Sequence, residues 1–138
     1  MKDKIEFLEK KDFSPEELKA FFESLAWESA NYADLAAKAL ENSDAVFSAY
    51  QGDLLIGLMN GITDGAMCVY CHYLAVRPEF QSFGIGGELT ERFLAHYQNI
   101  PVKVLVASEK SVNFYERKGF FVLKSGISMY HGNIIQPD

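Results

Sequence analysis

Residues 74–87 read LAVRPEFQSFGIGG, and the other elements of the chain can be placed around this stretch. An apolar, β-rich run leads into it, and an amphipathic helical pattern follows its three glycines. The first N–H groups of a helix have no partner within the helix, and the helix dipole favours an anion there. A strand that passes through glycines into a helix therefore predicts a phosphate-binding loop. Such glycines are also common in plain turns, so the loop alone leaves both interpretations open.

The length of 138 residues predicts one domain over residues 1–138, with enough apolar side chains to form a core. The net charge of −6 argues against nucleic-acid binding. No apolar run approaches the roughly 20 residues of a membrane helix, and the chain start lacks the apolar part of a signal peptide. We therefore expect a cytoplasmic protein that has neither a nucleic acid nor a membrane as a partner.

Cys68 and Cys71 form a C-x-x-C pattern, which is found in redox and zinc sites. Here the pair lies in a strand-like run, where residues three apart face opposite sides. A redox pair of this kind needs a helix N-terminus, and a zinc site needs a second pair of ligands. We therefore expect two ordinary packed thiols and no metal site.

The predicted elements follow the order β-α-α-β-β-β-α-β-α-β-β, which indicates an α+β fold with a mixed sheet. A helix begins at Ser14, because Ser-Pro-Glu-Glu is a typical capping sequence. Further helices are expected at 32–40, after the glycines, and at 111–118. Strands are expected at 4–9, 45–50, 54–62, 66–76 and 102–107, with a closing hairpin at 120–123 and 127–130.

Two motifs together point to a family. The pattern L-x-V-x-P-x-x-Q-x-x-G-x-G in residues 74–86 resembles the acetyl-CoA-binding motif of the GCN5-related N-acetyltransferase (GNAT) family. Residues 114–120, FYERKGF, resemble its second signature, F-Y-x-x-x-G-F. The resemblance covers nearly the whole chain. It implies α/β/α layers, with about four helices and a mostly antiparallel mixed sheet of about seven strands. In the family, the two central parallel strands splay apart, and the first of these strands usually contains a bulge.

The resemblance implies an acyltransferase of class EC 2.3.1 that uses acetyl-CoA as its cosubstrate and needs no metal. Its acceptor is expected to be a primary amine of a small molecule, which attacks the thioester directly. Two alternatives remain open: a protein or peptide acceptor, and a non-catalytic, regulatory CoA-binding member. Dimers are common in the family, so a homodimer is one assembly that the resemblance allows.

The resemblance also places the cofactor between the central strand and the strand at 102–107. The pyrophosphate is expected on the N–H groups of the loop, and the pantetheine arm beside the end of the central strand. Ser108 stands where the family often has asparagine. The implied cofactor-binding residues are Leu74, Ala75, Val76, Gln81, Ser82, Phe83, Gly84, Ile85, Gly86, Gly87, Ser108, Asn113 and Phe114.

Two residues are candidates for proton transfer. Tyr115 is the tyrosine of the second motif, where the family often has the acid that protonates the leaving thiolate; a packed aromatic is the simpler alternative. In the family the base is often a carboxylate on the central strand or a water molecule. The central strand here carries no carboxylate, so His72 is the candidate side chain, because its ordinary pKa lies near neutral, and a water-mediated base stays an alternative. A half-buried histidine without a catalytic role explains His72 equally well. In the family, the region between the first two helices, here residues 27–32, often covers the acceptor.

Overall fold

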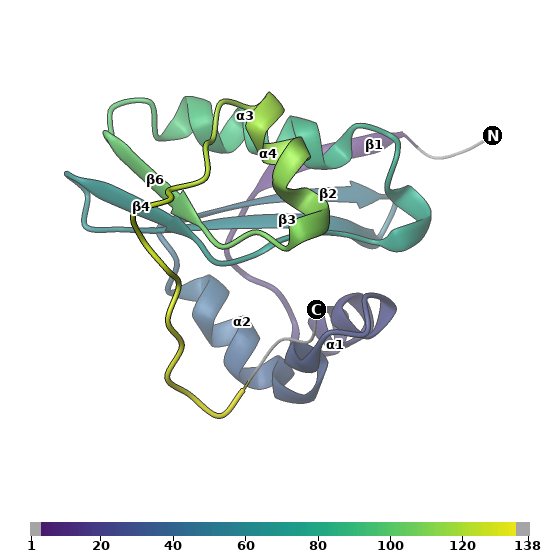
Figure 1. Ribbon diagram of the computed structural model, residues 1–138. Helices are drawn as coiled ribbons and strands as arrows, with labels where there is room; N and C mark the ends of the chain where they lie inside the picture. Colours follow the sequence, from purple (N-terminus) through teal and green to yellow (C-terminus); the bar gives the residue numbers. More distant parts are fainter. Residues whose placement is uncertain (1–3, 135–138) are drawn as a thin grey trace.

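The structure is a computed structural model that describes residues 4–134. A six-stranded mixed sheet forms its centre (Figure 1). Helices α1 (Pro15–Ser24) and α2 (Ala33–Glu41) cover one face of the sheet, and α3 (Ile85–His96) and α4 (Val112–Arg117) lie on the other. The predicted α+β fold, with its α/β/α layers and four helices, is confirmed.

The sheet has the strand order β1-β2-β3-β4-β6, and β5 also pairs with β3. All pairs are antiparallel except β4 with β6, which is parallel. The strands are β1 (Ile5–Glu9), β2 (Ala45–Gln51), β3 (Leu54–Thr63), β4 (Cys68–Cys71), β5 (Leu74–Val76) and β6 (Val102–Leu105). Three short 3-10 helices, η1 to η3, span Glu28–Tyr32, Pro78–Phe80 and Glu109–Ser111.

Helix α1 begins where its capping sequence predicts. The hydroxyl oxygen of Ser14 accepts the N–H of Glu17 at 3.1 Å, which satisfies one of the helix's unpaired donors. Its inner side chains, Leu18, Phe21 and Phe22, are fully buried and join α2 and the sheet in one apolar cluster. A second apolar cluster lies between the opposite face of the sheet and α3. The sheet is therefore buried on both faces, and functional groups must lie at its ends or at strand interruptions.

The strand predicted over residues 66–76 is interrupted between β4 and β5. On β3, Ile62 faces Tyr70 and Leu58 faces Ala75, so four steps along β3 match five on the facing strand. The extra residue is a β-bulge, which ends regular pairing and redirects the strand. The interruption thus agrees with the bulge that the family resemblance implies.

The closing hairpin predicted at residues 120–123 and 127–130 is wrong. Within the described part of the chain, no strand follows α4, and the segment runs past the sheet as an extended tail (Figure 1). The N–H of Phe120 bonds to the carbonyl of Tyr115 at 3.1 Å, and Met129 is 93% exposed. An apolar run predicts a strand only if a sheet edge receives it in register, and sequence spacing carries no information on that.

Both cysteines lie on β4 as free thiols, and Cys71 is buried. Within residues 4–134, no group of three or more histidine, cysteine, aspartate or glutamate side chains is arranged to hold a metal ion. None of the helices in the same range combines the length and the apolar character needed to span a bilayer.

Gly61 leaves room for the ring of Tyr97. A Cβ at Gly61 would lie 2.4 Å from the Tyr97 hydroxyl oxygen, and this buried tyrosine donates to a carboxylate oxygen of Asp44 at 2.8 Å. We expect Gly61→Ala to lower the free energy of unfolding by about 1–3 kcal/mol, as overpacking does. Urea denaturation measures this. The control is Gly126→Ala, whose Cβ would meet only Leu123, at 3.4 Å. Equal midpoints for the two variants would contradict the expectation.

Candidate active site

The bulge leaves one edge of β5 open. The Tyr73 carbonyl and the Arg77 N–H both bond to β3, at 3.1 and 2.8 Å. Because backbone polar groups alternate along an antiparallel strand, those of Leu74 and Val76 point away from β3. In the part of the chain that the structure describes, β5 pairs with β3 alone. The Val76 carbonyl accepts the Gln81 side chain, so β5 presents the N–H and C=O of Leu74 and the N–H of Val76 on its outer side, where an extended ligand can pair with them.

The two parallel strands separate at the bulge. Strand β4 pairs with β6 up to Cys71, which faces Leu105. Strand β6 ends at that residue, and the chain of β4 continues beyond the bulge as β5. This is the splayed arrangement predicted from the family resemblance, and it places the open edge of β5 directly after the β4–β6 pair.

The chain enters α3 through a loop with two left-handed residues. Ser82 has φ +85° and Gly84 has φ +79°, and Gly84 is the cap residue of the helix. The first helical hydrogen bond runs from the Glu88 N–H to the Gly84 carbonyl at 3.0 Å, and no side chain caps the helix start. The helix itself provides no acceptor for the N–H groups of residues 85–87. They are therefore available to an anion, which the helix dipole also favours.

Elements β5, α3 and α4 meet at Gly86. A Cβ placed there would lie 3.6 Å from Phe114 Cζ and 3.7 Å from Val76 Cγ2. Three of the predicted cofactor residues are thus neighbours in space, although Phe114 is far from the other two in the chain. Gln81 lies nearby, but its side-chain amide donates to the Val76 carbonyl at 2.9 Å. In this structure the Gln81 side chain therefore links the loop to the end of β5.

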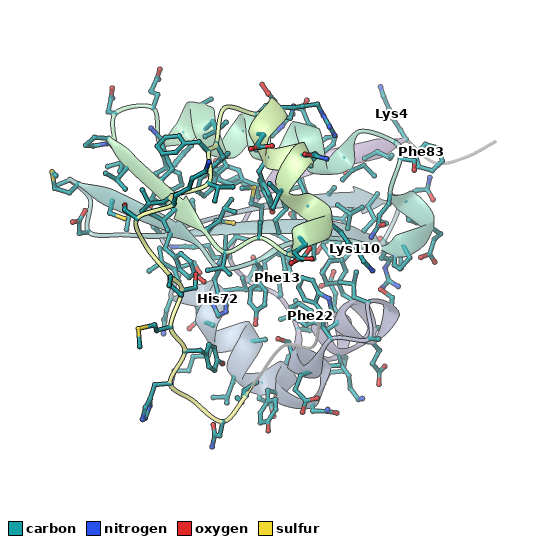
Figure 2. The ribbon with its side chains drawn as sticks, in the orientation of Figure 1. Lys4, Phe13, Phe22, His72, Phe83 and Lys110 are labelled. Carbon is teal, nitrogen blue, oxygen red and sulfur yellow. The ribbon has the colours of Figure 1, made fainter. Side chains whose placement is uncertain are left out.

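The remaining predicted contacts are exposed. Figure 2 shows Phe83 at the outer end of the loop. The Ser108 hydroxyl bonds to that of Ser111 at 3.1 Å, and Asn113 lies exposed on α4. Among the described residues, no hydrogen bond joins Ser108 or Asn113 to the glycine loop. The structure therefore brings residues 74–87 and Phe114 together, but leaves these two polar side chains at the margin.

Tyr115 lies on α4, half-buried, beside the point where β4 and β6 part. Burial is the main cause that raises its pKa well above the ordinary tyrosine value, and the Cys71 thiol at the end of β4 adds to the effect. A tyrosine of ordinary pKa is protonated in the neutral range, and the raised pKa extends this into alkaline solution. Tyr115 also lines a hollow of about 740 Å³ between β6, α4 and the tail.

His72 is one of the two residues of the bulge. Its ring stacks on that of Tyr73, with 4.5 Å between centroids and planes 2° apart. Neighbouring residues of a regular strand point to opposite faces, so this stack is a product of the bulge. Although His72 has an exposed edge, its partial burial lowers the pKa of its imidazole. A neutral imidazole at pH 7 is able to accept a proton.

Aromatic rings connect the bulge to the helices on the His72 side. Tyr73 packs against Phe22 and Trp27, with ring centroids 5.1 and 6.3 Å away. Its hydroxyl lies 3.0 Å from that of Ser29, in the region 27–32 expected to cover the acceptor. Figure 2 shows His72 and Phe22 on the side of the sheet that carries α1 and α2. Tyr115, on α4, approaches from the opposite side.

Two further polar residues belong to this site without any signal in the sequence. The Lys118 ammonium would lie 3.4 Å from a Cβ on Gly87 and bonds to Glu91 at 3.0 Å. It places a positive charge beside the first turn of α3. Asn60, buried in β3, accepts hydrogen bonds from the two N–H groups of the bulge. Neither residue has a spacing that relates it to the loop, so only the folded chain reveals them.

Solved acetyltransferase structures share this architecture. A GNAT-family acetyltransferase from Streptococcus pneumoniae TIGR4 is 26% identical with a TM-score of 0.80, covering 94% of this chain and 98% of its own. A protein from meticillin-resistant Staphylococcus aureus, described as a probable acetyltransferase, is 21% identical with a TM-score of 0.84, covering 94% and 100%. The aminoglycoside N-acetyltransferase AAC(6')-Iy, in complex with CoA, is 13% identical with a TM-score of 0.69, covering 94% and 95%.

No curated protein matches the chain significantly. The family model of the acetyltransferase (GNAT) domain, however, matches residues 9–131. That match includes the loop, the bulge and the α4 motif, and it agrees with the six-stranded sheet and its four helices. This chain therefore belongs to the GNAT acetyltransferase family.

Proposed function

We propose that this domain transfers an acetyl group from acetyl-CoA to a primary amine of a small molecule. One observation carries the proposal: from the open edge of β5 the chain passes through η2 and the glycine loop to a helix start whose N–H groups lack intrahelical acceptors. Acetyl-CoA supplies the acyl group as a thioester, at the end of a long arm that also carries amides and a pyrophosphate. An open strand edge suits the amides, and an uncapped helix start suits the anion.

The residues at the site fit such a ligand. The backbone of Leu74 and Val76 would orient the arm, and an N–H in this strand would also polarise the thioester carbonyl. The N–H groups of residues 84–87 would hold the pyrophosphate. Gly86 adds no side chain to the space beside Phe114, and Lys118 supplies positive charge close by.

His72 and Tyr115, which lie on opposite sides of the point where β4 and β6 separate, are the proposed proton-transfer residues. In the net reaction a nitrogen–carbon bond forms and the carbon–sulfur bond breaks, while the amine loses one proton and the sulfur gains one. His72, neutral because burial lowers its pKa, would take the proton of the amine. Tyr115, whose hydroxyl is protonated at neutral pH as that of any tyrosine is, would donate that proton to the sulfur.

The proposed acceptor class rests on the His72 side of the site. The partly exposed rings of Trp27 and Tyr73, which pack against the buried Phe22, border the bulge there. Aromatic faces attract ammonium groups, and they also pack against the apolar parts of amines. An aminoglycoside N-acetyltransferase of similar fold supports a small-molecule amine as the class to test first.

The test combines binding with turnover. Calorimetry with acetyl-CoA measures binding, and release of free thiol from acetyl-CoA measures transfer to polyamines, amino acids, aminoglycosides and peptides. We expect binding, and turnover with at least one small amine. Turnover with peptides alone would overturn the small-molecule assignment, binding without turnover would favour a regulatory member, and absence of binding would contradict the proposal entirely.

The base role of His72 predicts a specific pH dependence. Burial lowers the imidazole pKa, so protonation of His72 should add an acidic limb to kcat/KM with an apparent pKa below that of an ordinary histidine. We expect His72→Gln to remove this acidic limb and to lower the plateau by up to about 100-fold, the lower end for a positioned base. The limb due to the substrate's own ammonium group should remain in both enzymes. The same acidic limb in both would exclude His72 as the base.

A further inference from the structure

Asn60 holds the bulge through its side chain. Its amide oxygen accepts the N–H of His72 at 3.2 Å and that of Tyr73 at 2.7 Å, and its amide nitrogen donates to the Ser43 hydroxyl at 3.1 Å. The residue is 1% exposed. The two N–H donors also determine which way the amide points, because the opposite orientation would place an NH₂ group against them. One side-chain oxygen thus replaces the strand pairing that the bulge removes.

The same side chain ties the bulge to the end of α2. Ser43, which receives the Asn60 amide, donates its own proton to the Ala39 carbonyl at 2.9 Å. Next to it, the Asp44 N–H bonds to the Gly61 carbonyl at 2.9 Å. Asn60 therefore lies in a buried network whose members all have partners, and such networks specify one backbone arrangement.

The bulge determines which groups face the open edge of β5. Without the extra residue of the bulge, β5 would pair with β3 one position out of register. A one-residue slip reverses the direction in which every side chain and backbone amide of the strand points. Leu74 and Val76 would then direct their backbone groups to β3, and Ala75 would face outward. The stacking of His72 on Tyr73 would be lost as well, because it depends on two neighbouring residues pointing the same way.

We propose that Asn60 is a positioning residue for acyl transfer. By holding the His72–Tyr73 bulge, its oxygen sets the outward amides of β5 and the place of the His72 ring. Asn60 acts through the backbone and touches no substrate itself. The proposal rests on the proposed function, because it assigns the amides of β5 to acetyl-CoA.

Amide exchange in the unaltered protein tests the clamp by itself. We expect the N–H groups of His72 and Tyr73 to be protected from hydrogen exchange, although neither lies within a regular strand and the His72 side chain is exposed. Both donate to one buried oxygen, so the two protections should be similar. Exchange at the rate of an unstructured amide at either residue would overturn the clamp, whatever the protein catalyses.

Three variants test the role in catalysis. Asn60→Leu removes the oxygen; Asn60→Asp has the same shape and retains an oxygen for both N–H groups. The control, Ser48→Ala, removes another buried hydrogen bond, that of the Ser48 hydroxyl to the Leu8 carbonyl at 3.2 Å. We expect Asn60→Leu to lower kcat/KM for acetyl-CoA at least about tenfold, since small displacements at reacting groups cost up to about 100-fold. Asn60→Asp should remain within about threefold, because its charged oxygen also accepts both bonds.

The comparison separates positioning from stability. If Asn60 had only a structural role, Asn60→Leu would reduce the unfolding midpoint, as we expect of Ser48→Ala, without changing kcat/KM where the variants are folded. That result would overturn the proposal. If Asn60→Leu does not fold, Asn60→Asp is the deciding variant. A tenfold loss of kcat/KM in Asn60→Asp, with the N–H groups of His72 and Tyr73 still protected from exchange, would equally contradict the proposal. Failure of the unaltered protein to bind acetyl-CoA would instead remove the proposed function, and with it the positioning role of Asn60 in acyl transfer.

Discussion

Gly86→Asp is expected to weaken acetyl-CoA binding by about 1,000-fold, or ~4 kcal/mol, because a carboxylate would stand where the pyrophosphate is proposed to lie. The fold should survive the change. A Cβ at Gly86 meets Phe114 and Val76 at ordinary contact distances of 3.6 and 3.7 Å. An acidic residue in the first turn of a helix is also favourable, so α3 itself should not be weakened.

Isothermal titration calorimetry measures the effect, and Gly86→Ala is the matched control. Alanine adds the same Cβ without the charge, so we expect it to retain most of the affinity. If both variants lost binding equally, space rather than charge would be the cause, and the loop would still be the site. If Gly86→Asp bound acetyl-CoA like the unaltered protein, the assignment of the loop to the pyrophosphate would be wrong.

Tyr115→Phe is expected to lower kcat by about 100- to 1,000-fold, within the usual contribution of a positioned acid. Among the described residues the Tyr115 hydroxyl has no hydrogen-bond partner, so its removal leaves no protein group unpaired. Affinity for acetyl-CoA should therefore stay nearly unchanged. Single-turnover measurements should be used, because release of product can hide a change in the chemical step.

The raised pKa of Tyr115 adds a second expectation. A tyrosine that ionises well above its ordinary value keeps its proton at pH 9, so the unaltered enzyme should not lose activity there through Tyr115. Tyr50→Phe is a comparison in which another tyrosine hydroxyl of raised pKa, bonded to Glu17 at 2.6 Å, is removed far along the chain from the α4 motif. An unchanged single-turnover rate for Tyr115→Phe would exclude the acid role.

The parts of this fold that local sequence determines were predictable. Ser14 begins α1 because it caps the helix, and Gly84 precedes α3 because its positive φ suits glycine. The parallel pairing of β4 with β6 and the separation beyond it came from the family resemblance rather than from spacing. Each of these features depends on a few neighbouring residues or on a motif with a known order.

Features that depend on distant residues were not predictable. Asn60 lies 12 residues before His72, and nothing in that spacing indicates that its oxygen supports the bulge. Lys118 approaches Gly87 only because α4 packs beside α3. The hairpin at 120–130 failed for the same reason, since its apolar residues form strands only by pairing with a sheet edge, and in this structure they do not pair with β6, the last strand of the sheet. Strand pairing is a property of two segments, and a pattern in one of them is insufficient.

Acetyl-CoA is proposed to bind along the open edge of β5 and at the first turn of α3. Titration of ¹⁵N-labelled protein with acetyl-CoA, followed by amide chemical shifts, tests this site residue by residue. We predict the largest shifts at the N–H groups of Leu74, Val76 and residues 84–87. The separate hollow lined by residues 11–15 and by Ala37, Lys38 and Glu41 of α2 should show none. Shifts confined to that hollow, or unchanged amides along β5 and α3 at saturating acetyl-CoA, would contradict the account.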